Sequence, residues 1–248
     1  MRLQGKSAIV TGAASGFGEG IARRFAAEGA WVICADLNGQ GARRIAEETG
    51  GVAFAGDVAR EADVNAMVER AVTEFGGLDI LVNNAGTTHR NKPILEVTEE
   101  EFDRVHAVNV KSIFWTTRAA VPVLRQQGRG GSIINISSTA GLRPRPGLTW
   151  YNSTKGAVNT ATQAMAQEFA KDNIRVNAVC PVMSATGLLT EFMGGPDTPE
   201  TRARFVATIP LGRMSTPDDI ANACVWLAED ASSFITGVLL PVDGGRCA

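Results

Sequence analysis

Two kinds of hydrophobic pattern alternate along this chain of 248 residues. Short continuous apolar runs are typical of buried strands, whereas apolar residues that recur every three or four positions are typical of amphipathic helices. Repeated strand–helix units imply a parallel, doubly wound sheet with helices on both faces, so we predict a single α/β domain over 1–248. The pattern predicts strands at 7–11, 31–35, 52–56, 79–83, 132–137 and 174–179, and helices after the first strand and at 40–49, 61–75, 99–124 and 151–171.

Turn and cap residues agree with these boundaries. Thr98 and Glu101 have capping-box form, and Thr198-Pro199 and Thr216-Pro217 each predict a further helix start. Glycines separate the predicted helices from the strands that follow them, at 29, 50–51, 76–77 and 130–131.

A glycine-rich turn joins the first strand to the first helix. Gly12, Gly16 and Gly18 lie between the apolar run ending at Thr11 and a helical pattern through Ile21. Glycines permit a tight turn, and the unpaired N–H groups at the start of a helix bind anions such as a pyrophosphate. The spacing differs from the G-x-G-x-x-G dinucleotide fingerprint, and an ordinary strand–helix loop explains the turn equally well.

Asp36 ends the second strand, where an adenosine ribose lies in a nucleotide-binding βαβ unit. Its carboxylate would accept hydrogen bonds from ribose hydroxyls and repel the 2′-phosphate of NADP. No Arg or Lys occurs at 11–18 or at 37–38 to bind that phosphate, so the sequence favours NAD. The alternative is a helix N-cap or turn carboxylate.

Polar residues follow several other predicted strands. Asp57 follows the third, 83–86 (Asn-Asn-Ala-Gly) the fourth, Ser138 the fifth and Pro181 the sixth. Ligands of doubly wound sheets bind outside the carboxyl ends of the strands, so we expect these residues to line one crevice.

Tyr151 is the only tyrosine in the chain, and Lys155 follows it at the i+4 spacing. This spacing places both side chains on one face of a helix. A nearby ammonium favours the phenolate and lowers a tyrosine pKa by about 1–3 units, toward neutrality, which suits proton exchange with a carbonyl or alcohol. Taken alone, such a pair is more often a solvated helix face with an extended lysine.

Composition excludes several classes of partner. The net charge of −2 and pI of about 5.8 indicate neither nucleic-acid nor membrane binding. No secretory signal precedes the first strand, and no run approaches the ~18 apolar residues of a membrane span. The four cysteines form no C-x-x-C pair, which fits free thiols and a cytoplasmic protein. We assign no metal site.

The chain resembles the short-chain dehydrogenase/reductase family over nearly its whole length. This resemblance implies a Rossmann-like fold that binds a nicotinamide dinucleotide, and it implies a homotetramer in which helices 99–124 and 151–171 pair across one interface. The matching pieces are Thr11-Gly12-x-x-x-Gly16-x-Gly18, Asp57, Asn83-Asn84-Ala85-Gly86, Asn109, Ser138, Tyr151-x-x-x-Lys155, and Pro181 with Thr186.

The resemblance also implies roles for four catalytic residues. Tyr151 would exchange a proton with the substrate oxygen while hydride moves to or from the nicotinamide, and Ser138 would hold that oxygen. Lys155 would lower the tyrosine pKa and bind the nicotinamide ribose. Asn109 would support a water relay behind the lysine; the alternative is a surface or kink asparagine.

Cofactor contacts are implied along the glycine turn and the strand ends. The family's usual Pro-Gly after the sixth strand is Pro181-Val182 here, which weakens the assignment of Thr186 as a carboxamide contact. The implied contacts are Gly12, Ser15, Gly16, Phe17, Gly18, Asp36, Asp57, Val58, Asn84, Ala85, Gly86, Tyr151, Lys155, Pro181 and Thr186.

The substrate pocket is expected among residues 87–96, 139–150 and 184–210, the last forming a mobile lid. We hypothesise that a basic residue here, Arg143 or Arg145 foremost, binds an anionic group such as a substrate carboxylate. Arg90 is a further candidate arginine, and His89 precedes it in the same loop. Solvated loop charges are the alternative reading.

These observations favour an NAD(H)-dependent oxidoreductase that interconverts a secondary alcohol and a ketone on a small or cyclic substrate. A 3-oxoacyl-thioester (acyl carrier protein) reductase is the alternative within enzymes. A dinucleotide-sensing regulator without turnover is the alternative from another class, but such proteins tend to lose the Ser138, Tyr151 or Lys155 that this chain keeps.

Overall fold

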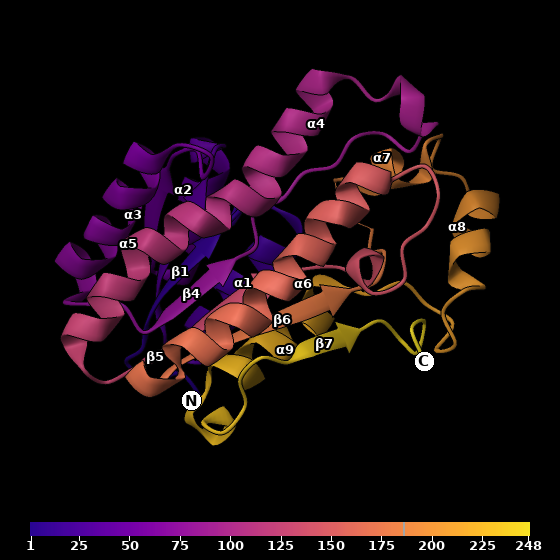
Figure 1. Ribbon diagram of the computed structural model, residues 1–248. Helices are drawn as coiled ribbons and strands as arrows, with labels where there is room; N and C mark the ends of the chain where they lie inside the picture. The colour runs from indigo at the N-terminus through magenta and orange to yellow at the C-terminus, as the bar shows by residue number, and fades with distance from the viewer. Residues whose placement is uncertain (186) are drawn as a thin grey trace.

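A computed structural model describes residues 1–185 and 187–248. Its centre is a sheet of seven strands, all parallel, in the order β3-β2-β1-β4-β5-β6-β7 (Figure 1). The order reverses direction between β1 and β4, which is the position where doubly wound sheets bind ligands. The strands are β1 (Ser7–Thr11), β2 (Trp31–Asp36), β3 (Val52–Ala55), β4 (Ile80–Asn83), β5 (Gly131–Ile136), β6 (Ile174–Pro181) and β7 (Leu239–Val242).

Helices cover both faces of this sheet, as Figure 1 shows. One core lies between the sheet and α1 (Gly16–Ala27), α2 (Gly39–Thr49) and α9 (Pro217–Ala228). The other core lies between the sheet and α3 (Glu61–Phe75), α5 (Ser112–Gln127) and α6 (Thr149–Phe169). Alternate strand residues supply the two cores, with Ala8 and Val10 in the first and Ile9 in the second, because side chains in a strand alternate between faces. The prediction of a doubly wound sheet is confirmed.

The helix predicted at 99–124 is interrupted. α4 (Glu99–His106) passes into a π-helical turn at Ala107–Lys111, and α5 continues from Ser112. The Thr98 capping box is present at the start of α4, and Thr216 forms a second capping box at the start of α9.

The region expected to be a lid contains two short helices. α7 (Leu189–Met193) and α8 (Pro199–Val206) lie here, and Thr198 caps α8 as predicted. The sequence pattern had predicted neither α7 nor β7. Figure 1 places α8 beyond the carboxyl ends of the strands, on the same side as the C-terminus, and α7 beside the start of α6.

Among the described residues, none of the helices combines the length and apolar character needed to cross a bilayer. All four cysteines are free, and three of them, Cys34, Cys180 and Cys224, are buried.

Candidate active site

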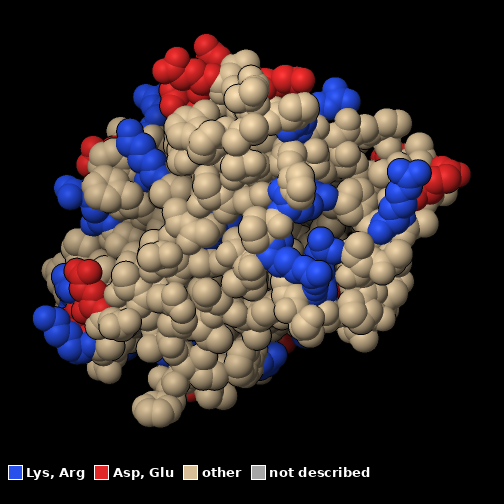
Figure 2. All heavy atoms as spheres, turned by 45° about the vertical axis from the view of Figure 1, so that its right-hand side comes forward, with Lys and Arg blue, Asp and Glu red and all other residues tan. Residues whose placement is uncertain are grey.

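A cavity of about 650 Å³ runs along the carboxyl ends of the strands. It begins at Asp36 and Asp57, passes the glycine turn, and ends at Tyr151 and the residues around α7. Figure 2 shows its surroundings as a hollow on the face that carries α8. The convergence of polar strand ends that the sequence predicted is therefore present.

The glycine turn is shaped by close backbone packing. Gly12 and Gly16 have φ of 67° and 60°, in the left-handed region that side chains disfavour. A Cβ on Gly18 would lie 2.0 Å from the Gly12 carbonyl oxygen, so the start of α1 approaches the turn only because this residue is glycine. Ser15, the residue before α1, and Phe17 line the cavity beside the turn.

Asn84 holds the glycine turn in place. Its Nδ2 donates to the carbonyl oxygens of Thr11 at 2.8 Å and Gly12 at 3.2 Å. The Thr11 hydroxyl accepts from the backbone N–H groups of Asn84 and Ala85, both at 3.0 Å. The predicted residues Asn84, Ala85 and Gly86 line the cavity, and the Asn84 amide stabilises the cavity wall.

Asp36 lies at the end of the cavity where the sequence predicts the adenosine. Its Oδ2 accepts from the Ala14 N–H at 2.9 Å and its Oδ1 from the Asn38 N–H at 2.8 Å, so the carboxylate is held in one orientation. Asp57 and Val58 line the same end, as predicted.

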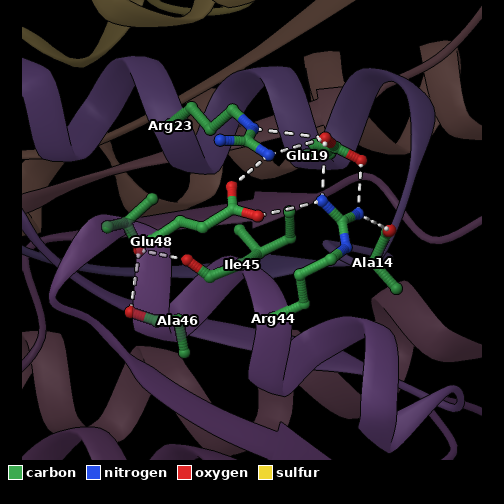
Figure 3. A network of polar contacts seen from close by, with 8 residues as sticks. Ala14, Glu19, Arg23, Arg44, Ile45, Ala46 and Glu48 are labelled. Atoms are coloured by element: carbon green, nitrogen blue, oxygen red, sulfur yellow. Dashed lines mark hydrogen bonds and ion pairs between the residues drawn. The ribbon is translucent and has the colours of Figure 1, made fainter.

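A guanidinium near this end is already paired with carboxylates (Figure 3). Arg44 donates to the Ala14 carbonyl at 3.1 Å, and it forms ion pairs with Glu19 at 2.9 Å and Glu48 at 3.3 Å. The pairing with Arg44 holds the pKa of Glu19 below its usual value. Arg23 pairs with the same two glutamates, so two guanidinium groups and two carboxylates form a charge-balanced cluster in which Arg44 is already engaged.

Tyr151, Lys155 and Ser138 meet at the other end of the cavity. Tyr151 and Lys155 lie one turn apart on α6 and are 7% and 5% exposed. The Lys155 Nζ donates to the Ile136 carbonyl at 2.8 Å and lies 5.7 Å from the centre of the Tyr151 ring. Ser138 follows β5, and its hydroxyl accepts from the Ala140 N–H at 3.0 Å.

The ionisation of this pair differs from the sequence expectation. Burial raises the pKa of Tyr151 to about 12, opposed by its interactions with the Ser138 hydroxyl and the Arg145 charge. Burial lowers the pKa of Lys155 to about 8. The expected lowering of the tyrosine pKa by Lys155 is therefore not found, because desolvation disfavours the charged form of both groups.

Asn109 lies behind the lysine, in the π-helical turn. It is 2% exposed, its Oδ1 accepts from the Thr87 N–H at 2.8 Å, and its Nδ2 donates to the Thr87 carbonyl at 2.9 Å and the Thr154 hydroxyl at 3.0 Å. A Cβ on Gly86 would be 3.5 Å from the Asn109 Oδ1 and 3.7 Å from the Lys155 Nζ. Asn109 and Lys155 thus flank the same glycine, and the π turn is the local irregularity that brings Asn109 inward.

Pro181 and Val182 line the cavity where β6 ends. Among the described residues, only Asn173 is a non-glycine residue with positive φ, so Val182 needs no glycine conformation. The Val182 N–H donates to the Val242 carbonyl at 3.3 Å. The departure from the family's Pro-Gly therefore introduces no backbone strain at this position. Thr186, the predicted carboxamide contact, lies outside the described residues.

The basic candidates for substrate binding separate into two pairs. Arg143 and Arg145 line the cavity. His89 is buried, with its Nδ1 against the Arg90 carbonyl, and Arg90 donates to the Gly194 carbonyl at 3.1 Å; neither lines the cavity.

Sequence reasoning missed two charged wall residues. Arg104 and Arg246 line the cavity but come from α4 and the C-terminal segment, outside the expected ranges. Phe192 of α7 also lines it and lies within the expected range 184–210. Phe192 packs edge-on against the Tyr151 ring, with the ring centres 5.1 Å apart. No short motif marks these residues; only the fold brings them to the site.

The residues present fit a nicotinamide dinucleotide. The glycine turn leaves room for a pyrophosphate at the start of α1, Asp36 faces a ribose position, and Lys155 and Tyr151 lie at the opposite end. Within 1–185 and 187–248, no group of three or more His, Cys, Asp or Glu side chains could hold a metal ion.

Comparisons with known proteins agree with this geometry. A family model described as enoyl-(acyl carrier protein) reductase matches residues 12–246. The chain is 53% identical to the 4-formylbenzenesulfonate dehydrogenase of Comamonas testosteroni, with 99% of both proteins aligned. It is 40% identical to the galactitol 2-dehydrogenase of Agrobacterium fabrum, again over 99% of both.

A solved structure agrees as well. The crystal structure of the 3-ketoacyl-(acyl-carrier-protein) reductase from Brucella melitensis, complexed with NADH, is 47% identical. It matches with a TM-score of 0.94 over 99% of this chain and 100% of that one. This protein belongs to the short-chain dehydrogenase/reductase family of oxidoreductases.

Proposed function

We propose that the protein is an NAD(H)-dependent oxidoreductase that interconverts a secondary alcohol and a ketone on a small or cyclic substrate. The observation that carries this proposal is the meeting of Tyr151, Ser138 and Lys155 at one end of a cavity that begins at Asp36. The related dehydrogenases support it, since both act on a CH–OH or carbonyl group by their names.

Tyr151 is the group that moves a proton. With its pKa raised to about 12, the phenol is protonated at neutral pH and donates its proton to a carbonyl oxygen during reduction. Ser138 holds the same oxygen by a hydrogen bond. When bound, the nicotinamide supplies or accepts the hydride. In the oxidative direction Tyr151 must accept a proton, so oxidation requires the phenolate and becomes faster as the pH rises.

Lys155 supplies a positive charge beside the phenol, and Asn109 supports the lysine. Lys155 keeps a positive charge below its pKa of about 8, and that charge lies within 6 Å of the phenol ring, where it stabilises a phenolate formed during turnover. Asn109 would support a water relay behind this lysine.

We infer that NAD is preferred over NADP. The Asp36 carboxylate faces the ribose end of the cavity, and the nearby Arg44 is paired with Glu19 and Glu48. A 2′-phosphate would therefore meet a negative group without a free guanidinium to balance it.

A 3-oxoacyl-thioester reductase is the second candidate. The 47% identity to a 3-ketoacyl reductase of the same length favours it. A non-catalytic dinucleotide sensor is less well supported, since a sensor needs no convergence of serine, tyrosine and lysine.

Three further proposals concern the protein as a whole. We propose a cytoplasmic homotetramer in which α5 and α6 pair across an interface; the half-exposed Phe114 on α5 suits such a contact. Residues 184–210 serve as the substrate lid.

The experiment is a substrate panel. NADH absorbance is followed with cyclic and aromatic ketones, aldehydes, polyols and a 3-oxoacyl thioester.

Tyr151→Phe keeps the ring packing against Phe192 and removes the hydroxyl. We expect it to lower kcat by about 100-fold or more, with the thermal midpoint retained. Full turnover by this variant would refute the proposal, and a strong preference for the thioester would establish the second candidate.

A further inference from the structure

Four guanidinium groups line the cavity; Arg104 comes from α4, and the other three come from two segments at the substrate end. Arg143 and Arg145 lie in the loop between η3 (Thr139–Gly141) and α6, and Arg246 lies near the C-terminus. Figure 2 shows basic side chains gathered around the hollow, while the acidic side chains in view lie mainly toward the rim of the molecule.

Each guanidinium contacts a neutral oxygen. The Arg143 Nη1 donates to the Arg246 carbonyl at 2.7 Å, the Arg145 Nη2 to the Phe192 carbonyl at 2.9 Å, and the Arg246 Nη1 to the Thr208 hydroxyl. A guanidinium has five N–H donors, so these contacts fix its position and leave most donors for another group.

These three charges lack a carboxylate in the part of the chain that the structure describes. All fourteen ion pairs found there involve other basic residues. The acidic residues of the cavity wall, Asp36 and Asp57, lie at the adenosine end. Burial is the main cause that lowers the pKa of Arg145 below its ordinary value, and the neighbouring positive charge of Arg246 lowers it further.

The remaining wall at this end is apolar. Phe192 packs edge-on against Tyr151, the Arg145 guanidinium lies 5.1 Å from the centre of the Phe205 ring, and Leu148 is buried. The Arg145 charge also acts on the Tyr151 phenol, so the guanidinium is near the reacting end. A substrate with an apolar middle would fill this space. Its reacting oxygen would lie at Tyr151, and a second polar group at its other end would lie at the arginines.

We propose that Arg143, Arg145 and Arg246 form an anion subsite, and that the substrate is an alcohol or carbonyl compound whose apolar, ring-sized body carries a carboxylate or sulfonate. The inference rests on the proposed function, since it names the substrate class of the same site. Guanidinium groups suit both oxyanions because they donate two parallel hydrogen bonds.

The kinetic test compares compounds matched in shape. 4-Acetylbenzoate and 4-formylbenzenesulfonate carry the charge, and methyl 4-acetylbenzoate and 4-(methylsulfonyl)benzaldehyde do not. We expect kcat/KM to be at least tenfold higher for the anions, and the anion-to-neutral ratio to fall at least tenfold in Arg145→Ala and Arg143→Ala. Arg145→Lys should retain part of the ratio. Arg204→Ala, which removes an exposed arginine of α8 outside the cavity wall, is the matched control and should keep it.

A binding measurement separates failure of the subsite from failure of the proposed function. Benzenesulfonate and neutral benzamide are titrated into the NADH-loaded protein by calorimetry. We expect benzenesulfonate to bind at least tenfold more tightly, and this advantage to be lost in Arg145→Ala and at high salt. If kcat/KM is the same for the charged and the neutral compounds while turnover is intact, the subsite proposal is overturned. If no carbonyl compound is reduced, the proposed function fails, and equal binding of the two probes would overturn the subsite independently.

Discussion

Burial sets the proton affinities of Tyr151 and Lys155 in opposite directions. The tyrosine keeps its proton more tightly than a free phenol, and the lysine releases its proton at about pH 8. Both effects have one cause, the cost of placing charge among buried groups. A neutral phenol and a lysine that is still mostly charged at neutral pH suit proton donation to a carbonyl.

The lysine makes stability depend on pH in a predictable direction. Between about pH 8 and 10.5 the folded chain holds a neutral Lys155 while the unfolded chain holds a charged one, so the unfolded state binds more protons. The contribution of Lys155 to the free energy of unfolding then rises with pH, by up to about 1.4 kcal/mol per unit. The buried thiols of Cys34 and Cys180 contribute with the opposite sign above about pH 9, and comparison with a variant at Lys155 cancels them. Tyr151 also acts oppositely to Lys155, but only above about pH 10. We expect cofactor-free wild type to gain stability relative to Lys155→Met from pH 7.5 to 9.5 in urea unfolding.

The control for this measurement is Lys171→Met, which removes an exposed lysine after α6. The difference between its free energy of unfolding and that of the wild type should stay constant over the same pH range. A constant difference for Lys155→Met as well would contradict the lowered lysine pKa.

Asp36 offers a second prediction at the scale of one residue. Asp36→Asn keeps an oxygen that can accept from the Ala14 or Asn38 N–H and removes the negative charge. A hydrogen bond to a charged group contributes about 1.5–3 kcal/mol, so the ratio of kcat/KM for NADH to that for NADPH should fall by about 10–100-fold. Steady-state kinetics with both cofactors provides the measurement. An unchanged ratio would show that Asp36 does not set the preference.

At the scale of elements, the start of α1 depends on the absence of a side chain. A Cβ on Gly18 would press on the Gly12 carbonyl, so Gly18→Ala must displace the turn or the helix. We expect NADH affinity, measured by fluorescence titration, to fall at least tenfold.

Gly156→Ala is the comparison, because a Cβ on this α6 residue meets nothing within 4 Å. That variant should bind NADH as wild type does and gain about 0.5–1 kcal/mol of stability from helix propensity. Equal NADH affinity for both variants would refute the role of close packing at Gly18.

Local signals explain which elements were predictable. The boundaries of α3 and the caps at Thr98, Thr198 and Thr216 follow from residues within one helical turn. The π-helical turn could not be predicted from such local residues, because the sequence around Asn109 continues a helical pattern on both sides. Its inward position depends on hydrogen bonds to Thr87 and Thr154, which are distant in sequence.

At the scale of the whole molecule, the sheet gathers the site from across the chain. Motifs at strand ends were found because a parallel sheet brings all carboxyl ends to one edge. Arg246 and Phe192 carried no such signal, because their positions follow from the paths of the C-terminal segment and α7. The sequence therefore predicts the cofactor half of the cavity better than the substrate half.

The cavity touches the ends of most strands, so a cofactor bound there should stabilise the fold as a unit. A ligand at 100 times its Kd adds about 2.7 kcal/mol to the free energy of unfolding, which corresponds to roughly 5–11 °C in the thermal midpoint of a chain this size. We expect NADH to produce such a shift and NADPH at the same concentration a clearly smaller one, because the proposed placement of Asp36 would set its carboxylate against the extra phosphate. In Gly18→Ala the NADH shift should shrink, while Gly156→Ala keeps it. Equal shifts with the two cofactors in wild type would contradict the preference for NAD, and the absence of a shift with either would contradict the assignment of the cavity.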